Sequence, residues 1–216
     1  MWVEGAAVLV DAVMTRTVVT VAPTVTLAEA AALMHRGRFR HLPVLDGGRL
    51  VGVVSEREVR PPPGLDPTAR QELQTRHVRE VMTSRVITVA PDDPLEHAAL
   101  LLYENKIGCL PVLRGQALVG IITASDIFQA FVRMTGLLEP ATRVEISVDD
   151  LPAILRGVAD VVEQERMPVV GLLLERGETN AARTLVVRFA TLQGPRLTGA
   201  LRARGLPVHA PQSTEE

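Results

Sequence analysis

Hydrophobic and polar positions follow the same order in two stretches of this chain, residues 13–60 and 81–128. When the stretches are laid over each other at a constant offset of 68 residues, 20 of the 48 positions carry the same amino acid. Unrelated stretches of that length would share roughly three, and self-similarity at a fixed period marks a repeated structural unit. The sequence therefore predicts two copies of one small fold.

Each copy shows the same succession of patterns. A run rich in β-branched residues ends at a proline, and in the first copy a capping box of Thr26 and Glu29 then opens a helix. The turn sequence Asp46-Gly47-Gly48 predicts a hairpin between two further apolar runs. The order is therefore strand, helix, strand, strand, helix, expected in the first copy at residues 18–21, 26–37, 41–45, 50–54 and from about 55 onward.

The second copy differs at the start of its first helix. Here we expect Asp93 to be the cap and Pro94 the first helical residue. A unit of about fifty residues buries little surface alone, so the two copies are expected to pack on each other. Three prolines at 61–63 end the first copy, and the polar residues 66–79 form a connector with room for a short helix.

The last part of the chain follows a different pattern. Residues 143–148 alternate between polar and apolar, as a half-exposed strand does, and Asp149 or Asp150 is placed to cap the next helix. The remaining elements, expected at 169–175, 183–190, 195–204 and 207–209, complete a β-α-β-β-α-β order, which is that of a ferredoxin-like domain.

The predicted fold class is thus α/β (α+β), with two β-α-β-β-α repeats and a C-terminal ferredoxin-like domain. The expected boundaries are 1–62 for repeat one, 63–78 for a linker, 79–135 for repeat two, 136–142 for a second linker, 143–210 for the third domain and 211–216 for a disordered tail.

The net charge, the cysteine count and the length of the apolar runs disfavour several classes of protein. The net charge of −2 disfavours a nucleic-acid binder, which usually carries a basic excess. A single cysteine excludes an internal disulfide and fits a reducing compartment. No apolar run reaches the 18 or so residues of a membrane span, and the first ten residues make a poor signal peptide. We therefore expect a cytoplasmic protein.

We expect a ligand-binding site where the last strand of each copy meets its last helix, at Gly120–Asp126 and Gly52–Glu58. A strand that runs into a helix N-terminus leaves backbone donors exposed, which suits a phosphate. Asp126, one turn into the helix, can accept hydrogen bonds from a diol such as a ribose. A single occurrence would more often be a capped helix with nothing bound. The repetition favours binding.

These residues carry a resemblance to tandem CBS domains, which sense adenosine-containing ligands. It rests on the paired Met-Thr, Leu-Pro-Val and Gly-x-x-Ser/Thr-x-x-Asp patterns, as in Met14-Thr15 and Gly120–Asp126. Residues 148–155 resemble the start of an ACT domain. The combination, with 107–111 and 131–136, resembles the acetoin-utilisation AcuB family.

The resemblance implies a nucleotide in the cleft between the repeats, with its ribose on the motif Asp and its phosphate near the Ser or Thr and basic groups. Carried onto this chain, one expected site consists of Thr123, Ser125 and Asp126, with Arg85 and Val86. The other consists of Ser55, Arg57 and Glu58, with Thr17 and Val18. Glu58 replaces Asp and would forfeit about ten- to a hundredfold in affinity, so Asp126 ranks first for ribose.

Basic groups precede the Leu-Pro of the first repeat only. Arg40 and His41 are phosphate candidates, whereas repeat two has Gly108 and Cys109 there. Which ribose site Arg40 serves stays open, as does the alternative of a solvated surface charge for this residue. We expect Cys109 to be a buried small hydrophobe rather than a reactive thiol, because no basic residue flanks it.

The resemblance to ACT domains points to the loop of Asp149, Asp150, Leu151, Pro152 and Ala153. ACT domains bind amino acids at a glycine after the first strand, and here Ala153 stands in that place, so its methyl group would crowd a ligand. The segment is therefore expected mainly to dimerise.

The expected function is that of a non-catalytic regulatory protein, which forms a homodimer through its CBS and ACT-like domains. It would bind AMP, ADP, ATP or S-adenosylmethionine, without a further cofactor, and signal to an unidentified protein, with a link to acetoin or carbon metabolism. Neither nucleic acid nor membrane is an expected partner. The five histidines show no metal-ligand spacing, and the acidic pairs 92–93 and 149–150 stand at helix starts. The alternatives are an acetoin-metabolism enzyme or subunit and a ligand-free scaffold.

Overall fold

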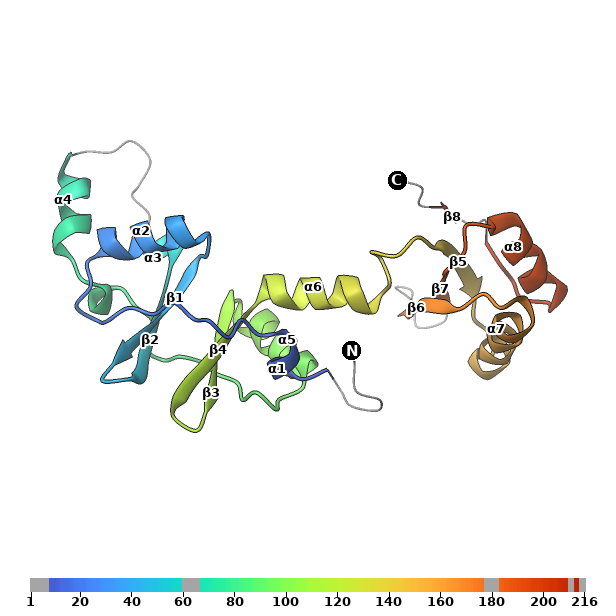
Figure 1. The fold of residues 1–216 in the computed structure, drawn as a ribbon, viewed down its shortest axis with the longest axis horizontal. Helices are drawn as coiled ribbons and strands as arrows, with labels where there is room; N and C mark the ends of the chain where they lie inside the picture. Colours follow the sequence, from blue (N-terminus) through green and yellow to red (C-terminus); the bar gives the residue numbers. More distant parts are fainter. Residues whose placement is uncertain (1–7, 60–66, 177–182, 210–211, 214–216) are drawn as a thin grey trace. The chain divides into compact units, whose positions relative to one another are not determined.

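A computed structural model describes residues 8–59, 67–176, 183–209 and 212–213, and the chain divides into two compact units. The first unit comprises residues 1–128 and holds both repeats, and the second comprises residues 129–216 (Figure 1). The division falls within one helix, α6 (Ala124–Met134). The prolines at 61–63 and the first seven residues lie outside the described residues.

The two repeats have matching elements. Repeat one contains α1 (Val10–Val13), α2 (Leu27–Gly37), β1 (His41–Asp46), β2 (Arg49–Ser55) and α3 (Glu56–Val59). Repeat two contains the 3-10 helix η1 (Val78–Glu80), α5 (Leu95–Asn105), β3 (Cys109–Arg114), β4 (Ala117–Thr123) and α6. The connector forms α4 (Pro67–Thr75), which confirms the expected short helix.

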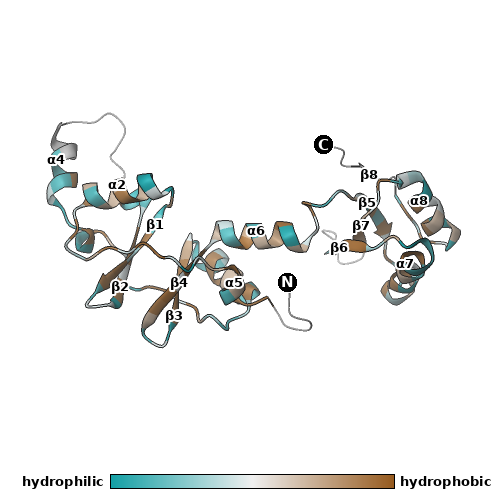
Figure 2. Ribbon diagram, in the orientation of Figure 1, coloured by the Kyte–Doolittle hydropathy of each residue, from teal (hydrophilic) through white to brown (hydrophobic). Residues whose placement is uncertain are grey.

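The hairpins form as predicted. β1 pairs with β2 and β3 with β4, each antiparallel and each with one register shift at the same place in the repeat. Gly47 and Gly48 have φ values of 54° and 83°, which side chains disfavour, so the turn requires glycine there. Figure 2 shows β3 and β4 hydrophobic along most of their length, since both lie in the core of the unit.

The capping box of Thr26 and Glu29 is confirmed at the start of α2. The corresponding prediction for α5 is wrong. Asp93 accepts a hydrogen bond from the backbone N–H of Ala90 at 2.8 Å, and Pro94 is the N-cap of a helix that starts at Leu95. The carboxylate of Asp93 therefore accepts its hydrogen bond from the preceding turn and does not cap the helix.

The predicted first strand, residues 18–21, is also wrong. Only Val21 makes a bridge, to Val44, and in the second copy only Val89 does so, to Val112. The residues before Val21 lead instead to the other repeat. Thr15 exchanges two backbone hydrogen bonds with Ile121 of β4, and Thr83 exchanges two with Val53 of β2. The opening segment of each repeat thus pairs with the hairpin of the other repeat.

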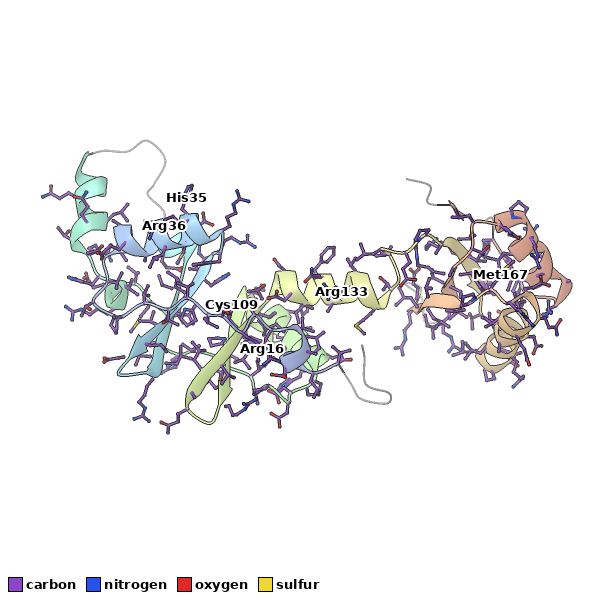
Figure 3. The ribbon with its side chains drawn as sticks, viewed as in Figure 1. Arg16, His35, Arg36, Cys109, Arg133 and Met167 are labelled. Atoms are coloured by element: carbon purple, nitrogen blue, oxygen red, sulfur yellow. The ribbon has the colours of Figure 1, made fainter. Side chains whose placement is uncertain are left out.

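The second unit has the predicted ferredoxin-like order. Its elements are β5 (Thr142–Ser147), α7 (Leu151–Glu165), β6 (Val169–Arg176), β7 (Arg183–Phe189), α8 (Gly194–Ala203) and β8 (Gln212–Ser213). The sheet order is β6-β7-β5-β8, antiparallel throughout. Its core contains Phe189, Met167 (Figure 3) and the apolar faces of α7 and α8.

Two predictions in this unit need correction. The expected strand at 207–209 contributes one bridge, from Val208 to Ile146, while the last strand is β8. Because β8 pairs with Thr142 and Arg143 at the free edge of β5, residues 212–213 are not the disordered tail that was expected. The turn at 177–180 and residues 214–216 lie outside the described part of the chain.

Candidate functional site

The two repeated motifs form the same local structure. At the start of α6, the backbone N–H and hydroxyl of Thr123 donate to Asp126 Oδ2 at 2.8 and 2.7 Å, and the Asp126 N–H donates back to the hydroxyl at 3.4 Å. At the start of α3, the backbone N–H of Ser55 donates to Glu58 Oε2 at 2.8 Å, and its hydroxyl donates to the same oxygen. Glu58 thus makes the same contact as Asp126, although its side chain is one methylene longer.

The second oxygen of each carboxylate distinguishes the two motifs. Oδ1 of Asp126 makes no hydrogen bond to another described residue, so it can accept one from a ligand. Oε1 of Glu58 lies 3.5 Å from Nε of Arg57. Burial raises the pKa of Glu58, but hydrogen bonds from Ser55 and the charge of Arg57 outweigh it, and the net pKa is lowered. Glu58 is therefore ionised at neutral pH and already paired.

The motif of repeat one opens onto a cavity of about 440 Å³, which we call the Ser55 cavity. β2 and α3 supply one wall, the segment after Thr83 a second, and the end of α5 with the start of β3 a third. The predicted residues that line it are Ser55, Arg57, Glu58, Arg85, Val86, Arg40 and His41.

The motif of repeat two opens onto a cavity of about 340 Å³, the Thr123 cavity. Its walls are β4 with α6, the segment after Thr15, and the end of α2 with the start of β1. The predicted residues that line it are Thr123, Ser125, Asp126, Thr17, Val18, Arg40 and His41. All twelve predicted nucleotide-site residues therefore line a cavity between the repeats.

The predicted grouping of these residues is wrong. Thr123 and Asp126 share a cavity with Thr17 and Val18, not with Arg85 and Val86. The physical reason is the exchange of opening segments, because the bridge from Thr15 to Ile121 brings the residues after Thr15 beside β4. The bridge from Thr83 to Val53 brings Arg85 beside β2 in the same way.

Arg40, His41 and Gly108 line both cavities, so Arg40 belongs to neither site alone. A Cβ atom on Gly108 would lie 2.7 Å from the His41 ring, which explains why glycine stands opposite this histidine. Burial, and after it the charge of Arg40, lowers the pKa of His41. His41 is therefore mostly neutral at pH 7, and Arg40 is the cation of this shared wall.

Cys109 is buried at the start of β3 (Figure 3), and burial raises the pKa of its thiol to about 12. The thiolate is thus negligible at neutral pH, and the expected unreactive thiol agrees with this environment.

Sequence reasoning missed one pair of residues. Arg38 lines the Thr123 cavity and Lys106 lines the Ser55 cavity, and each is the left-handed C-cap of its helix with φ of 53°. They occupy the same repeat position, since 38 + 68 = 106. Two basic residues at one repeat position were the available signal, although nothing in the local pattern marks a helix end as part of a cavity.

The predicted ACT-like loop forms the start of α7. Asp150 is the N-cap and accepts a hydrogen bond from the Ala153 N–H at 3.2 Å, which confirms the expected acidic cap. Asp149, Pro152 and Ala153 are exposed, and Leu151 is half-buried. The loop therefore has an established capping role.

In the part of the chain that the structure describes, no group of three or more His, Cys, Asp or Glu side chains could hold a metal ion. Every helix in this part of the chain is too short or too polar to cross a membrane.

Residues 10–60 and 78–133 match the CBS domain family. The CBS domain-containing protein YhcV of Bacillus subtilis is 33% identical over 114 residues, which cover 53% of this chain and 79% of that protein. The chain spans only 22–47% of the length of several other curated relatives, some of which are named as metabolic enzymes.

Two solved structures are similar to more than half of this chain. A candidate acetoin-utilisation protein (AcuB) from Vibrio cholerae is 36% identical, with a TM-score of 0.50 over 62% of this chain and 94% of that one. The CBS domain pair of protein MJ0100, solved with 5'-methylthioadenosine and S-adenosyl-L-methionine, is 27% identical, with a TM-score of 0.51 over 58% of this chain and 97% of that one.

Proposed function

This chain belongs to the CBS-domain family, and we propose from that premise that it is a non-catalytic regulatory protein that binds adenosine-containing ligands between its repeats. The observation that carries the proposal is the free oxygen of Asp126, which faces a cavity next to the Thr123 hydroxyl and Arg40. This arrangement offers an acceptor for a ribose diol and a cation for a phosphate. The ligands of the MJ0100 pair, both adenosine compounds, support the same chemistry.

Binding would act as a signal. A ligand changes the geometry of the pair only through its different affinities for two states, a coupling of about 1–3 kcal/mol. We propose that the second unit, as an ACT-like domain over about 143–210, receives this change and passes it to a regulated protein in the cytoplasm. The likeness to the Vibrio cholerae protein supports a role in acetoin or carbon metabolism.

Two alternatives make different predictions. A catalyst or subunit of acetoin metabolism would turn over acetoin or a related compound as the purified protein. A ligand-free scaffold would show no change in stability with any adenosine compound. The open acceptor at Asp126 and the basic cavity walls favour the sensor over both.

We expect an adenosine ligand at a hundred times its dissociation constant to stabilise the protein by about 2.7 kcal/mol. In Asp126→Asn the amide can still cap Thr123, but one charged acceptor is lost, so a ligand whose ribose is held by Asp126 loses about ten- to a hundredfold in affinity. At the same ligand concentration the stabilisation should then fall to roughly 0.4–1.4 kcal/mol. Thermal unfolding against AMP, ADP, ATP, 5'-methylthioadenosine and S-adenosylmethionine measures this.

Glu29→Gln is the matched control. Glu29 forms the same box with Thr26 in α2 but lines neither cavity, so its variant should keep the full ligand effect. Equal losses in both variants would mean that the cap, not the ligand contact, is responsible. No stabilisation of wild type by any of the five compounds would contradict the sensor and favour the scaffold.

We also propose a homodimer formed through exposed apolar residues of the first unit. Tyr103 and Leu100 of α5 are 82% and 50% exposed, and Phe128 of α6 is 66% exposed. Apolar side chains one turn apart on a helix indicate an interaction surface. Light scattering should give twice the chain mass for wild type and the single mass for Tyr103→Glu. A monomeric wild type would refute the dimer.

A further inference from the structure

The two cavities occupy equivalent repeat positions but carry different charges. Arg57 and Arg85 line the Ser55 cavity, and their equivalents in the Thr123 cavity are Ser125 and Thr17, since 57 + 68 = 125 and 17 + 68 = 85. The two cavities can therefore be compared directly. Their lining residues stand at equivalent repeat positions, and the Ser55 cavity has two guanidinium groups where the Thr123 cavity has two hydroxyl groups.

The remaining basic groups add to this difference. Lys106 lines the Ser55 cavity as its equivalent Arg38 lines the other, and Arg40 is shared. The Ser55 cavity thus has three basic side chains of its own, and the Thr123 cavity has one. Both Arg38 and Lys106 are left-handed C-caps, an ordinary helix ending that Arg166 of α7 shares, so the repeat alone accounts for their equivalent places.

The acidic groups do not cancel this excess. Glu58 is engaged by Ser55 and lies 3.5 Å from Arg57, and Glu56 is exposed at the start of α3. With Arg40 counted in both, the formal charges are four positive against two negative in the Ser55 cavity, and two positive against one negative (Asp126) in the other. Among the described residues, Arg40, Arg85 and Lys106 form no ion pair, so all three are available to an anion.

We propose that the two cavities divide the ligands by phosphate charge. The larger Ser55 cavity takes a nucleoside polyphosphate on Arg57, Arg85 and Lys106, and the Thr123 cavity takes an adenosine compound with little or no phosphate on Asp126. Arginine recognises phosphate through paired, directed hydrogen bonds, whereas the Thr17 and Ser125 hydroxyls contribute no charge. The helix dipole plays no part at α3, which has only one turn. This inference rests on the proposed function.

The reciprocal exchange of repeat residues tests it. Titration calorimetry with ATP and with 5'-methylthioadenosine is done on the full chain, on Arg57→Ser/Arg85→Thr, and on the matched Thr17→Arg/Ser125→Arg. The first variant should lose at least about tenfold in ATP affinity and change less than about threefold for methylthioadenosine. Its ATP affinity should also depend less on salt, because fewer cations meet the phosphates. The second variant should gain ATP binding at the Thr123 cavity, because that cavity then carries the same two arginines as the Ser55 cavity.

Asp126→Asn completes the test, since it should weaken methylthioadenosine and leave ATP within about threefold. If wild type binds neither compound, the proposed function and this inference both fail. If wild type binds both but the arginine exchange leaves ATP unchanged, or weakens both compounds equally, the sensor stands and the division by charge is refuted.

Discussion

Phe189→Ala should destabilise the second unit by about 3–5 kcal/mol, the cost of emptying a core position filled by a large aromatic ring. Phe189 is fully buried at the end of β7, where it is paired with Thr142 of β5 and Val169 of β6. Its ring therefore lies where three strands and both helices share one core. For a domain of this size, each kcal/mol lowers the melting temperature by roughly 4–8 °C, so the unit should melt at least about 12 °C earlier.

Leu192→Ala is the control, because Leu192 lies three residues further on and is 59% exposed. It should change stability by less than about 0.5 kcal/mol. Both variants should keep wild-type ligand affinity at a temperature where the second unit is folded. Every residue that lines either cavity falls between 15 and 126, within the first unit. A small effect of Phe189→Ala on unfolding would contradict the core assigned to this unit.

Features that depend on neighbouring residues could be predicted from the sequence. The turn at 46–48 requires positive φ, and the box of Thr26 and Glu29 needs only one helical turn. Eight of the twelve predicted nucleotide-site residues line the cavities for the same reason, since they stand at or beside the end of a strand (Arg40, His41, Ser55, Arg57, Glu58, Thr123, Ser125 and Asp126).

Features that depend on a distant partner could not be predicted in this way. The residues at 18–21 have strand composition, but the chain there passes from Ile121 of one hairpin to Val44 of the other and pairs with neither at length. The same passage determines which cavity Thr17 and Arg85 enter. A pattern repeated in both copies is consistent with pairing inside a copy or between copies, so the sequence alone left the grouping open.

Leu110→Ala should remove about 2–5 kcal/mol from the first unit. Leu110 is fully buried in β3 and stands opposite Ile122 in β4, which is buried too and directly precedes Thr123. The cavity left behind would loosen the strand pair that positions Gly108 on one side and the Thr123 box on the other. The melting temperature should fall by roughly 4 °C for each kcal/mol of stability lost, and ligand affinity should fall as well.

The repeat provides the matched variant, Leu42→Ala, since 42 + 68 = 110 and Leu42 is likewise fully buried, opposite Val54. Because the start of β1 lines the Thr123 cavity and the start of β3 lines the Ser55 cavity, each hairpin supports a wall of both cavities, and either variant should weaken binding in both. Differential scanning calorimetry with and without ligand measures the two effects together. If one variant weakened only the cavity of its own motif, each hairpin would support one cavity alone, and the shared walls would be contradicted.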